Sequence, residues 1–390
     1  MNRNWCYKKI GDVCIVERGG SPRPIEDYIT DDPDGINWIK IGDTSDSMYI
    51  THTAQRIRRD GMKKSRYVQP GDFLLSNSMS FGRPYILKID GCIHDGWLLL
   101  RDQYGYFDKR FLYYYLSSKT TYERFKSLAV GGVVNNLNSE MVRNVDVPIP
   151  NLEEQCQVAD LLDRIISVIQ ARQRQLHTLD TLIKAQFVEL FGAFPENPMG
   201  WETGTIRDVV SDVRYGSSRP AVEGGRYPYL RMNNITYGGE LDLTDTKQID
   251  VPENELEKCT VRRGDVLFNR TNSKELVGKT CVYNRDEMMV LAGFVIRIRL
   301  NNQMLPDFLS AFLNTDFSKA MLLGMCKTAI GQANINAQEM QGIQLYIPPI
   351  ERQAEFVRFK EQIDKSKAIV QKALTEAQLL FDSLMQKYYG

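Results

Sequence analysis

Two related phrases open two long helix-like stretches of the chain. The first is "PIPNLEEQ", from Pro148 to Gln155, and the second is "YIPPIERQ", from Tyr346 to Gln353. Their shared prolines, glutamates and glutamines lie 198 positions apart. A proline followed by charged residues is typical of the start of a helix. Beyond each phrase no glycine or proline occurs until Gly192 and Gly390, which predicts two helices of about 40 residues each.

The repetition extends over the whole chain. Motifs of the first half recur in the second half in the same order, and their spacing drifts only from 193 to 198 residues. Loops that differ by a few residues explain such a drift, so the sequence is a tandem duplication. The matched segments are 5–13 with 201–209, 18–24 with 214–220, 70–77 with 263–270, 111–118 with 308–315, 135–138 with 333–336, and 191–192 with 389–390.

Each repeat has a β-rich part and a helical part. Short β-branched and aromatic runs such as "INWIKIGD" and "GFVIRIRL" alternate with turn residues, which predicts a β-rich α/β or α+β domain. We expect a short helix over 108–116 and its repeat over 307–313. The predicted domains are 1–150 and 193–347, and the predicted long helices are 151–192 and 348–390.

Both long stretches carry an apolar stripe at heptad-like spacing. We place it at 158, 161, 165, 168, 172, 175, 179, 182 and 186, and in the second copy at 356, 359, 363, 366, 370, 373, 377, 380 and 384. A lone helix would leave this stripe in water, so we expect the two helices to pair antiparallel, about 60 Å long, with the domains related by an approximate two-fold axis. The other possibility is that each helix packs only on its own domain. Arg172 and Gln175 interrupt the first stripe and would form a polar layer or a partner contact.

The composition indicates an ordinary soluble protein of the cytoplasm. Formal net charge is zero, and no apolar run is long enough to span a membrane. Seven scattered cysteines without a CxxC pair, together with three histidines, give no zinc or disulfide pattern. The start of the chain has no apolar signal segment.

No catalytic motif stands out. The stretch "SKELVGKT", from Ser273 to Thr280, ends like a phosphate-binding loop, but it lacks the first glycine of that motif. We interpret it as a glycine turn that leads into a strand. The acidic run "PENELEK", from Pro252 to Lys258, is interpreted as a solvated surface. We therefore expect a non-catalytic protein with no cofactor or metal of its own.

The candidates for DNA contact are cations and asparagines on turn-rich segments. The segment "RIRRDGMKKSR", from Arg56 to Arg66, holds six cations and one acid, and clustered cations can contact several phosphates. Arginine and asparagine can also read guanine and adenine edges. The candidates are Arg56, Arg58, Arg59, Lys63, Lys64, Arg66, Asn77 and Arg83 in the first repeat, and Arg231, Asn233, Asn269, Arg270, Asn272 and Lys274 in the second.

With "RGGSPRP", "WIKIGD" and "PGDFLLS" inside the domain and the two helix-opening phrases, the whole chain resembles the specificity subunit of type I restriction-modification systems. The resemblance implies two target-recognition domains that each read half of a bipartite, asymmetric double-stranded DNA target. It also implies helices that set the half-site spacing and dock two modification subunits. Those partners would bind S-adenosylmethionine and methylate adenine, while restriction subunits would use ATP and Mg²⁺ for translocation and cleavage.

Two alternatives stay open at this point. One is a duplicated scaffold that binds protein or glycan, and the other is the recognition subunit of another class of restriction-methylation enzyme. A further expectation concerns the loop before the last strand of each domain. It contains Gly131 and Gly132 in the first copy and Gly331 in the second, and it would approach DNA or a partner.

Overall fold

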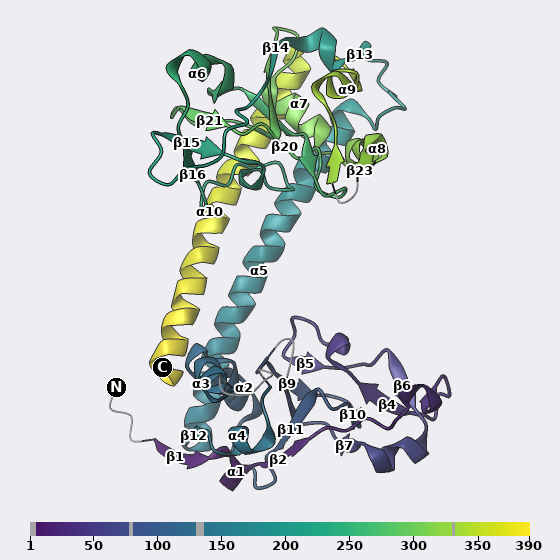
Figure 1. The fold of residues 1–390 in the computed structure, drawn as a ribbon, viewed down its shortest axis with the longest axis vertical. Helices are drawn as coiled ribbons and strands as arrows, with labels where there is room; N and C mark the ends of the chain where they lie inside the picture. Colours follow the sequence, from purple (N-terminus) through teal and green to yellow (C-terminus); the bar gives the residue numbers. More distant parts are fainter. Residues whose placement is uncertain (1–4, 78–80, 130–135, 330–331) are drawn as a thin grey trace. The chain divides into compact units, whose positions relative to one another are not determined.

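The computed structural model describes residues 5–77, 81–129, 136–329 and 332–390 (Figure 1). The chain divides into two compact units, residues 1–171 with 373–390 and residues 172–372. Each unit contains one β-rich domain, which we call a head, together with part of each long helix. These helices are α5 (Leu152–Phe191) and α10 (Ile350–Tyr389).

The first head contains two five-stranded sheets and a two-stranded one. The order β2-β11-β8-β9-β5 comprises Ile15–Arg18, Trp97–Arg101, Phe73–Ser76, Pro84–Leu87 and Tyr49–Ile50. The order β3-β6-β4-β10-β7 comprises Ile29–Thr30, Gln55–Ile57, Ile36–Ile39, Gly91–Ile93 and Arg66–Val68. Strand β1 (Cys6–Lys9) pairs with β12 (Asp146–Ile149). The helices are α1 (Ile10–Val13), α2 (Lys109–Ser117), α3 (Lys119–Ala129) and α4 (Ser139–Arg143), with 3-10 turns η1 (Ile25–Asp27), η2 (Ile41–Asp43) and η3 (Arg59–Lys64).

The second head repeats the order of the central strands, but its two main sheets have four strands each in the described residues and a three-stranded sheet is added. The order β14-β22-β18-β20 comprises Val210–Tyr215, Val295–Leu300, Val266–Asn269 and Thr280–Val282, and the order β16-β15-β21-β17 comprises Lys247–Ile249, Tyr227–Leu230, Met289–Leu291 and Thr260–Val261. Strand β13 (Thr203–Thr205) pairs with β25 (Gln344–Tyr346), and β19 (Thr271–Asn272), β24 (Gln332–Asn334) and β23 (Lys327–Ala329) form a third sheet. The helical elements are η4 (Ile206–Val209), η5 (Met232–Asn234), α6 (Glu253–Cys259), α7 (Pro306–Leu313), α8 (Asp316–Met325) and α9 (Ala337–Gln341).

The strand order establishes the duplication independently of sequence. In each head one of the sheets has a parallel pair at its centre, β4 with β10 in the first head and β15 with β21 in the second. The first head has a further parallel pair, β5 with β9, at the edge of its other five-stranded sheet. Strands β6 and β16 flank these pairs on one side, and β7 and β17 flank them on the other. The predicted tandem repeat and its β-rich α/β heads are therefore confirmed, as are the short helices α2 and α7.

The glutamine of the first helix-opening phrase is a buried structural tie. Gln155 is 0% exposed, and its side-chain amide nitrogen donates to the carbonyls of Tyr106 and Pro150, both at 2.9 Å. Its amide oxygen accepts from the backbone N–H of Asp108, also at 2.9 Å. Asp108 is the N-cap of α2, so this one side chain fixes the start of α5 against the start of α2.

The second phrase builds the same tie. The amide nitrogen of Gln353 donates to the carbonyls of Gln303 and Pro348 at 2.8 Å, and its oxygen accepts from the N–H of Leu305 at 2.8 Å. Leu305 is the N-cap of α7. Three identical contacts at equivalent positions explain why both phrases keep glutamine, because a shorter or charged side chain could not donate and accept at these sites.

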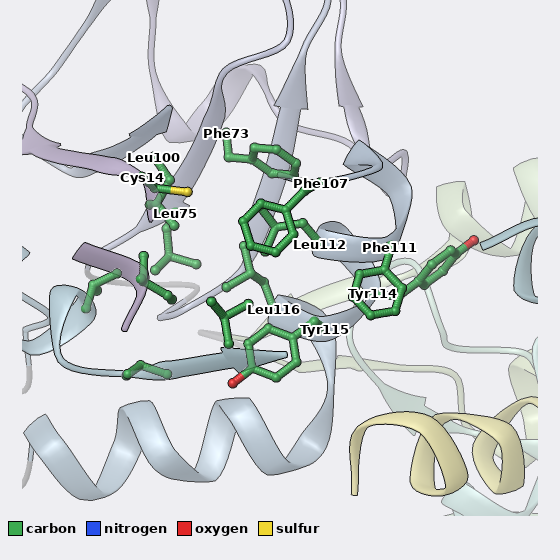
Figure 2. Packing of buried hydrophobic residues seen from close by; sticks show 14 of the residues in the cluster. Cys14, Phe73, Leu75, Leu100, Phe107, Phe111, Leu112, Tyr114, Tyr115 and Leu116 are labelled. Carbon is green, nitrogen blue, oxygen red and sulfur yellow. The ribbon is translucent and has the colours of Figure 1, made fainter. Parts of the chain in front are cut away.

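The core of the first unit lies between a sheet, the short helices and the long helices. Figure 2 shows strand residues Phe73, Leu75 and Leu100 in one cluster with Phe107 and with Leu112 of α2. The last helical residue of α10 joins this core, since the ring of Tyr389 lies 5.3 Å from that of Phe111 and its hydroxyl donates to the carbonyl of Phe111. The end of α10 and the start of α5 therefore belong to one core.

Contacts in the second unit give the direction of the helix pair. The ring of Phe187, near the end of α5, lies 5.2 Å from that of Phe356, near the start of α10. Seven residues earlier on α5, Asp180 binds the ammonium of Lys367, eleven residues later on α10. The residue numbers run in opposite senses, so the predicted antiparallel pairing is confirmed in this unit.

The predicted apolar stripe is wrong at six of its eighteen positions, which are exposed: Leu161, Val168, Gln175, Leu182, Ser366 and Leu380. On α5, Leu161 and Val168 were placed on the buried face, but they are 36% and 47% exposed. Their neighbours Leu162 and Ile169 are buried instead, at 0% and 8%. The seam, meaning the line of buried residues between the two long helices, proceeds from Val158 by a step of four residues and then a step of three. The prediction started from the same residue with a step of three and then a step of four. A three-residue step and a four-residue step differ by one position, which is about 100° around a helix.

The same shift occurs on α10 and changes the chemistry of the seam. Leu380 is 52% exposed, and the ring of Phe381 packs 6.4 Å from that of Tyr114 instead. Ser366 was predicted to face inward, but the largely buried residue is Lys367, whose ammonium binds Asp180 at 2.5 Å and the carboxylate of Glu240. The seam therefore contains a charged cluster that the predicted register omitted.

Two further expectations concern polar and glycine-rich positions. Arg172 lies on the half-buried side of α5, and its guanidinium donates to the side-chain oxygen of Gln175 at 2.9 Å. Gln175 itself is exposed, so the two residues do not form the buried polar layer that the stripe suggested. The loop glycines Gly131, Gly132 and Gly331 lie outside the described residues, and their predicted role stays a prediction.

Candidate DNA interface

The connection between β6 and β7 is held against one aromatic ring. The guanidinium carbon of Arg58 lies 5.6 Å and the ammonium of Lys64 lies 5.1 Å from the centroid of Tyr28. The Lys64 ammonium also donates to the Tyr28 hydroxyl at 2.7 Å. A Cβ added to Gly61 would lie 2.9 Å from the ring, so glycine permits this close approach. The turn η3 is thus fixed at both ends and in the middle.

The cations of η3 differ in how strongly they are paired. Arg58 binds Asp60 through Nη2 at 2.9 Å and Nε at 3.3 Å, and this hydrogen bonding raises the pKa of Arg58. The hydrogen bond to Tyr28 raises the pKa of Lys64, so its ammonium stays charged. Arg59 and Lys63 are exposed on the same turn. Neither has an ion pair with any residue in the described part of the chain.

The two outer arginines of the basic segment are occupied. Arg56 donates to the carbonyl of Pro33, and Arg66 lies 3.3 Å from the carboxylate of Glu17. Both are exposed at the surface, but each has a partner within the head.

Two candidates on the neighbouring sheet differ in access. Arg83 is exposed, and its guanidinium donates to the carbonyl of Ser45 at 3.2 Å. Asn77 is 3% exposed, and its amide donates to the carbonyl of Asp95 at 2.8 Å. A buried amide with its own backbone partner cannot reach a base edge in this conformation, so Asn77 is a structural residue.

In the second head, one pair of candidates lies at the start of η5. Arg231 precedes this turn, and its guanidinium donates to the carboxylate of Asp245 at 2.9 Å and to its carbonyl at 3.2 Å. Asn233, two residues later, is exposed. Of these two side chains, Asn233 presents its amide to solvent, whereas Arg231 holds the following loop in place.

The other candidates of the second head lie on one loop after β18. Asn269 is fully buried, and its amide, oriented to suit its neighbours, donates to the carbonyl of Thr271 and accepts from Asn272. Arg270 lies 4.9 Å from the ring of Tyr215, which is itself exposed. Lys274 is exposed at the following turn. Arg270, Asn272 and Lys274 thus lie on one short segment after β18, and the amide of Asn272 is tied to that of Asn269 by a hydrogen bond.

The stretch that resembles a phosphate-binding loop has another role. Lys279 is 7% exposed, and its ammonium donates to the carbonyl of Met232 at 2.9 Å. Gly278 takes a positive φ of 78°, and strand β20 follows at Thr280. A phosphate loop leads into a helix with a free lysine, so the interpretation as a glycine turn before a strand is confirmed.

Sequence reasoning missed two features of the first head. Tyr28, the ring beside Arg58 and Lys64, was not among the candidates, because it precedes Arg56 by 28 residues and only the fold brings this ring to the cations. Arg23, which is exposed within "RGGSPRP", lines a cavity of about 560 Å³ with Trp38 and His94. Burial lowers the pKa of His94, whose Nδ1 faces the N–H of Gly96 at 2.6 Å. Arg23 recurs as Arg219 in the second copy of this motif, and that repetition could have marked Arg23 as a candidate.

Within residues 5–77, 81–129, 136–329 and 332–390, no three histidine, cysteine, aspartate or glutamate side chains come together as a metal site. None of the helices in these ranges has the length and apolar character needed to cross a bilayer.

Comparison with known proteins gives one consistent result. A family model described as "Type I restriction modification DNA specificity domain" matches the chain twice, at residues 2–180 and 198–379. The chain is 22% identical over 421 residues to the "Type I restriction enzyme EcoKI specificity subunit" of Escherichia coli, covering 100% of this chain and 89% of that protein. It is 21% identical over 422 residues to the StySPI specificity subunit of Salmonella potsdam, covering 100% and 90%.

Solved structures share the fold. A chain from a study of "complex assembly and conformational transition of the type I R-M system" matches with a TM-score of 0.63 at 18% identity, covering 100% of this chain and 98% of that one. The S subunit of a type I restriction-modification system from M. genitalium matches with a TM-score of 0.54 at 15% identity, covering 99% and 97%. Both matches include the heads and the long helices.

The two family matches together span more than nine tenths of the chain, and each contains one head and the greater part of one long helix. The relatives are specificity subunits, so the expectation of a specificity subunit rather than a catalytic one is confirmed. With two equivalent heads, two glutamine ties and two matches to one family model, the chain belongs to the family of type I restriction-modification DNA specificity proteins.

Proposed function

We propose that this chain recognises a bipartite, asymmetric DNA target and directs adenine methylation and restriction by partner subunits. Each head reads one half of the target, and the paired helices set the distance between the halves. The relatives that cover nearly the whole chain are specificity subunits of type I restriction enzymes, which supports this function over a scaffold for protein or glycan.

One observation carries the proposal. The two heads keep the same strand order and the same glutamine tie, but their exposed connections differ in sequence and charge. A conserved framework with divergent surface loops is the arrangement expected of two readers with different half-sites. The exposed cations of η3 and the loop of Arg270, Asn272 and Lys274 are the proposed contacts with double-stranded DNA.

The proposal also assigns the chemistry to partners. Two modification subunits bind S-adenosylmethionine, and restriction subunits bind ATP and Mg²⁺, while this chain holds none of these cofactors. A cytoplasmic location is part of the proposal, and the seven free cysteines are compatible with a reducing compartment. The isolated chain is expected to bind DNA weakly and in a salt-dependent manner, and the modification subunit is expected to tighten that binding.

The decisive experiment maps methylated adenine across the genome of the host with and without this chain. Deletion is expected to abolish methylation at one bipartite motif and to leave other motifs unchanged. A chimera in which residues 6–149 are replaced by 202–347, with Asp307→Arg in the transplanted copy to meet the acids of α5, should methylate a target with two identical halves. If deletion changes no methylated motif, or if the chimera keeps the original motif, the proposed function is wrong.

A further inference from the structure

The same connection carries opposite charge in the two heads. In the first head it runs from β6 to β7, and in the second from β16 to β17. Strand register makes these connections equivalent, since Tyr67 pairs with Cys92 in the first head as Thr260 pairs with Val290 in the second. The central strands β10 and β21 are the parallel partners of β4 and β15, so both connections occupy the same place in the fold.

The two connections differ strongly in net charge. Residues 56–66 carry six cations and one acid, a net charge of +5. The equivalent residues 248–259 carry four acids and one cation, a net charge of −3. An acidic helix, α6, replaces the basic turn η3. Such a surface would repel a polyanion, because like charges within about 8–10 Å are not fully screened at physiological salt.

The basic turn is presented in one conformation. Arg58 and Lys64 lie against the ring of Tyr28 from the two ends of η3, and the backbone of Gly61 closes on the ring between them. The N–H of Arg58 donates to the carbonyl of Tyr28 at 2.8 Å. Charges on a turn held in this way lose less conformational entropy on binding than charges on a mobile loop.

Not all six cations are available. Asp60 neutralises Arg58, Glu17 lies beside Arg66, and Arg56 donates into the turn that contains Asp32. Asp60 and Glu17 thus offset the charges of Arg58 and Arg66, and the guanidinium of Arg56 is engaged by a carbonyl. The exposed charges that remain on the turn are Arg59 and Lys63, flanked by Lys64.

The acids of the second head are only partly compensated. Glu255 binds Arg219 at 2.8 Å, and Glu253 lies 3.9 Å from Arg226. Lys258 is the one cation of the connection, and it is exposed. No equivalent of the Arg59 and Lys63 pair is present on α6, whose described sequence is ENELEKC.

We propose that η3 of the first head is a phosphate-binding surface that supplies sequence-independent DNA affinity, and that the second head has no counterpart of it. This inference rests on the proposed function and assigns unequal roles to the heads. The first head anchors the DNA backbone as well as reading its half-site. The second head relies on the loop of Arg270, Asn272 and Lys274.

Salt dependence measures this role directly. Each phosphate contact releases condensed counterions, so the logarithm of the binding constant falls with the logarithm of salt concentration by about 0.9 per contact. Loss of two contacts should therefore reduce the slope by about 1.8. A phosphate contact carries no sequence information, so the loss of affinity should be equal for all duplexes.

The experiment uses the full chain with its modification subunit and a fluorescent duplex of random sequence, followed by anisotropy from about 50 to 300 mM salt. The test variant is Arg59→Gln with Lys63→Gln. The matched control removes two exposed cations from the second head, Lys247→Gln with Lys258→Gln. Circular dichroism and the thermal midpoint are expected to be unchanged in both, because all four side chains are exposed.

The expected result is a slope smaller by about 1.8 for the first-head variant, with the same proportional loss on a duplex carrying the methylated motif, and a slope within about 0.5 of wild type for the control. An unchanged slope with DNA binding retained overturns the inference and leaves the proposed function intact. Weaker binding of the motif alone would mean base reading, and weaker assembly with the modification subunit would mean a protein contact. Either result overturns it. Absence of DNA binding by the wild-type complex would reject the proposed function itself.

Discussion

The glutamine tie gives the most direct test of how the chain is built. In Gln155→Leu, a side chain of similar volume loses two donated hydrogen bonds, to Tyr106 and Pro150, and leaves the N–H of Asp108 without its acceptor. Each lost bond is worth about 1 kcal/mol, and an orphaned buried donor costs about 1–3 kcal/mol. We expect the free energy of unfolding of the first unit to fall by about 2–4 kcal/mol.

Urea unfolding followed by tryptophan fluorescence measures this loss, because Trp5, Trp38 and Trp97 lie in the first unit and Trp201 in the second. The control is Gln157→Leu on the exposed face of the same helix, which should change the free energy of unfolding by less than about 0.5 kcal/mol. Equal effects of the two substitutions would refute the reasoning, since they would mean that the buried hydrogen bonds carry no net stability.

Three further predictions test other parts of the structure. Lys367→Met removes the cation that binds two half-exposed carboxylates, Asp180 and Glu240, and leaves those like charges without their common partner. It should lower the free energy of unfolding of the second unit by about 1–2 kcal/mol in urea unfolding, and greater stability would contradict this. Burial lowers the pKa of His94, so the unfolded chain takes up this proton first, and stability should fall with a slope of up to about 1.4 kcal/mol per pH unit as pH drops below about 6.5. His94→Gln should remove that contribution. Gly239→Ala places a Cβ 2.8 Å from a strand carbonyl, whereas Gly264→Ala at a similar positive φ meets nothing within 4 Å, so the first should lower the thermal midpoint more than the second.

The fold could be predicted from the sequence because the chain contains two copies of the same motifs in the same order. Each motif of one repeat had a partner in the other, and the strand runs, the short helices and the long helices follow those motifs. The helix register was harder, because Leu161 and Leu162 are both leucines and only packing decides which is buried. Lys367 was missed for a related reason, since a lysine at a seam position is stabilised only by Asp180 and Glu240, which are remote in sequence.

The candidate contacts show the same limit. The basic segment was correctly located as an exposed turn, because clustered cations rarely lie inside a head. Asn77 and Asn269 were selected by residue type, but burial and backbone partners make both structural. Residue type alone does not distinguish an asparagine that hydrogen-bonds the backbone of a turn from one that contacts a base. Only the position of the neighbouring carbonyls distinguishes them, and that depends on the folded loop.

The two repeats retain their hydrogen-bonded ties but reverse an ion pair between head and helix. Arg110 on α2 donates to Asp163 on α5 at 2.7 Å, whereas Asp307, its equivalent on α7, lies 3.2 Å from Lys360 on α10. A glutamine tie depends on the geometry of three backbone groups and so keeps its residue, while an ion pair needs only opposite signs and can invert. A head placed on the helices of the other unit would then bring like charges together, which disfavours that arrangement. The chimera with two second heads therefore needs Asp307→Arg in the transplanted copy, so that it meets the acids of α5.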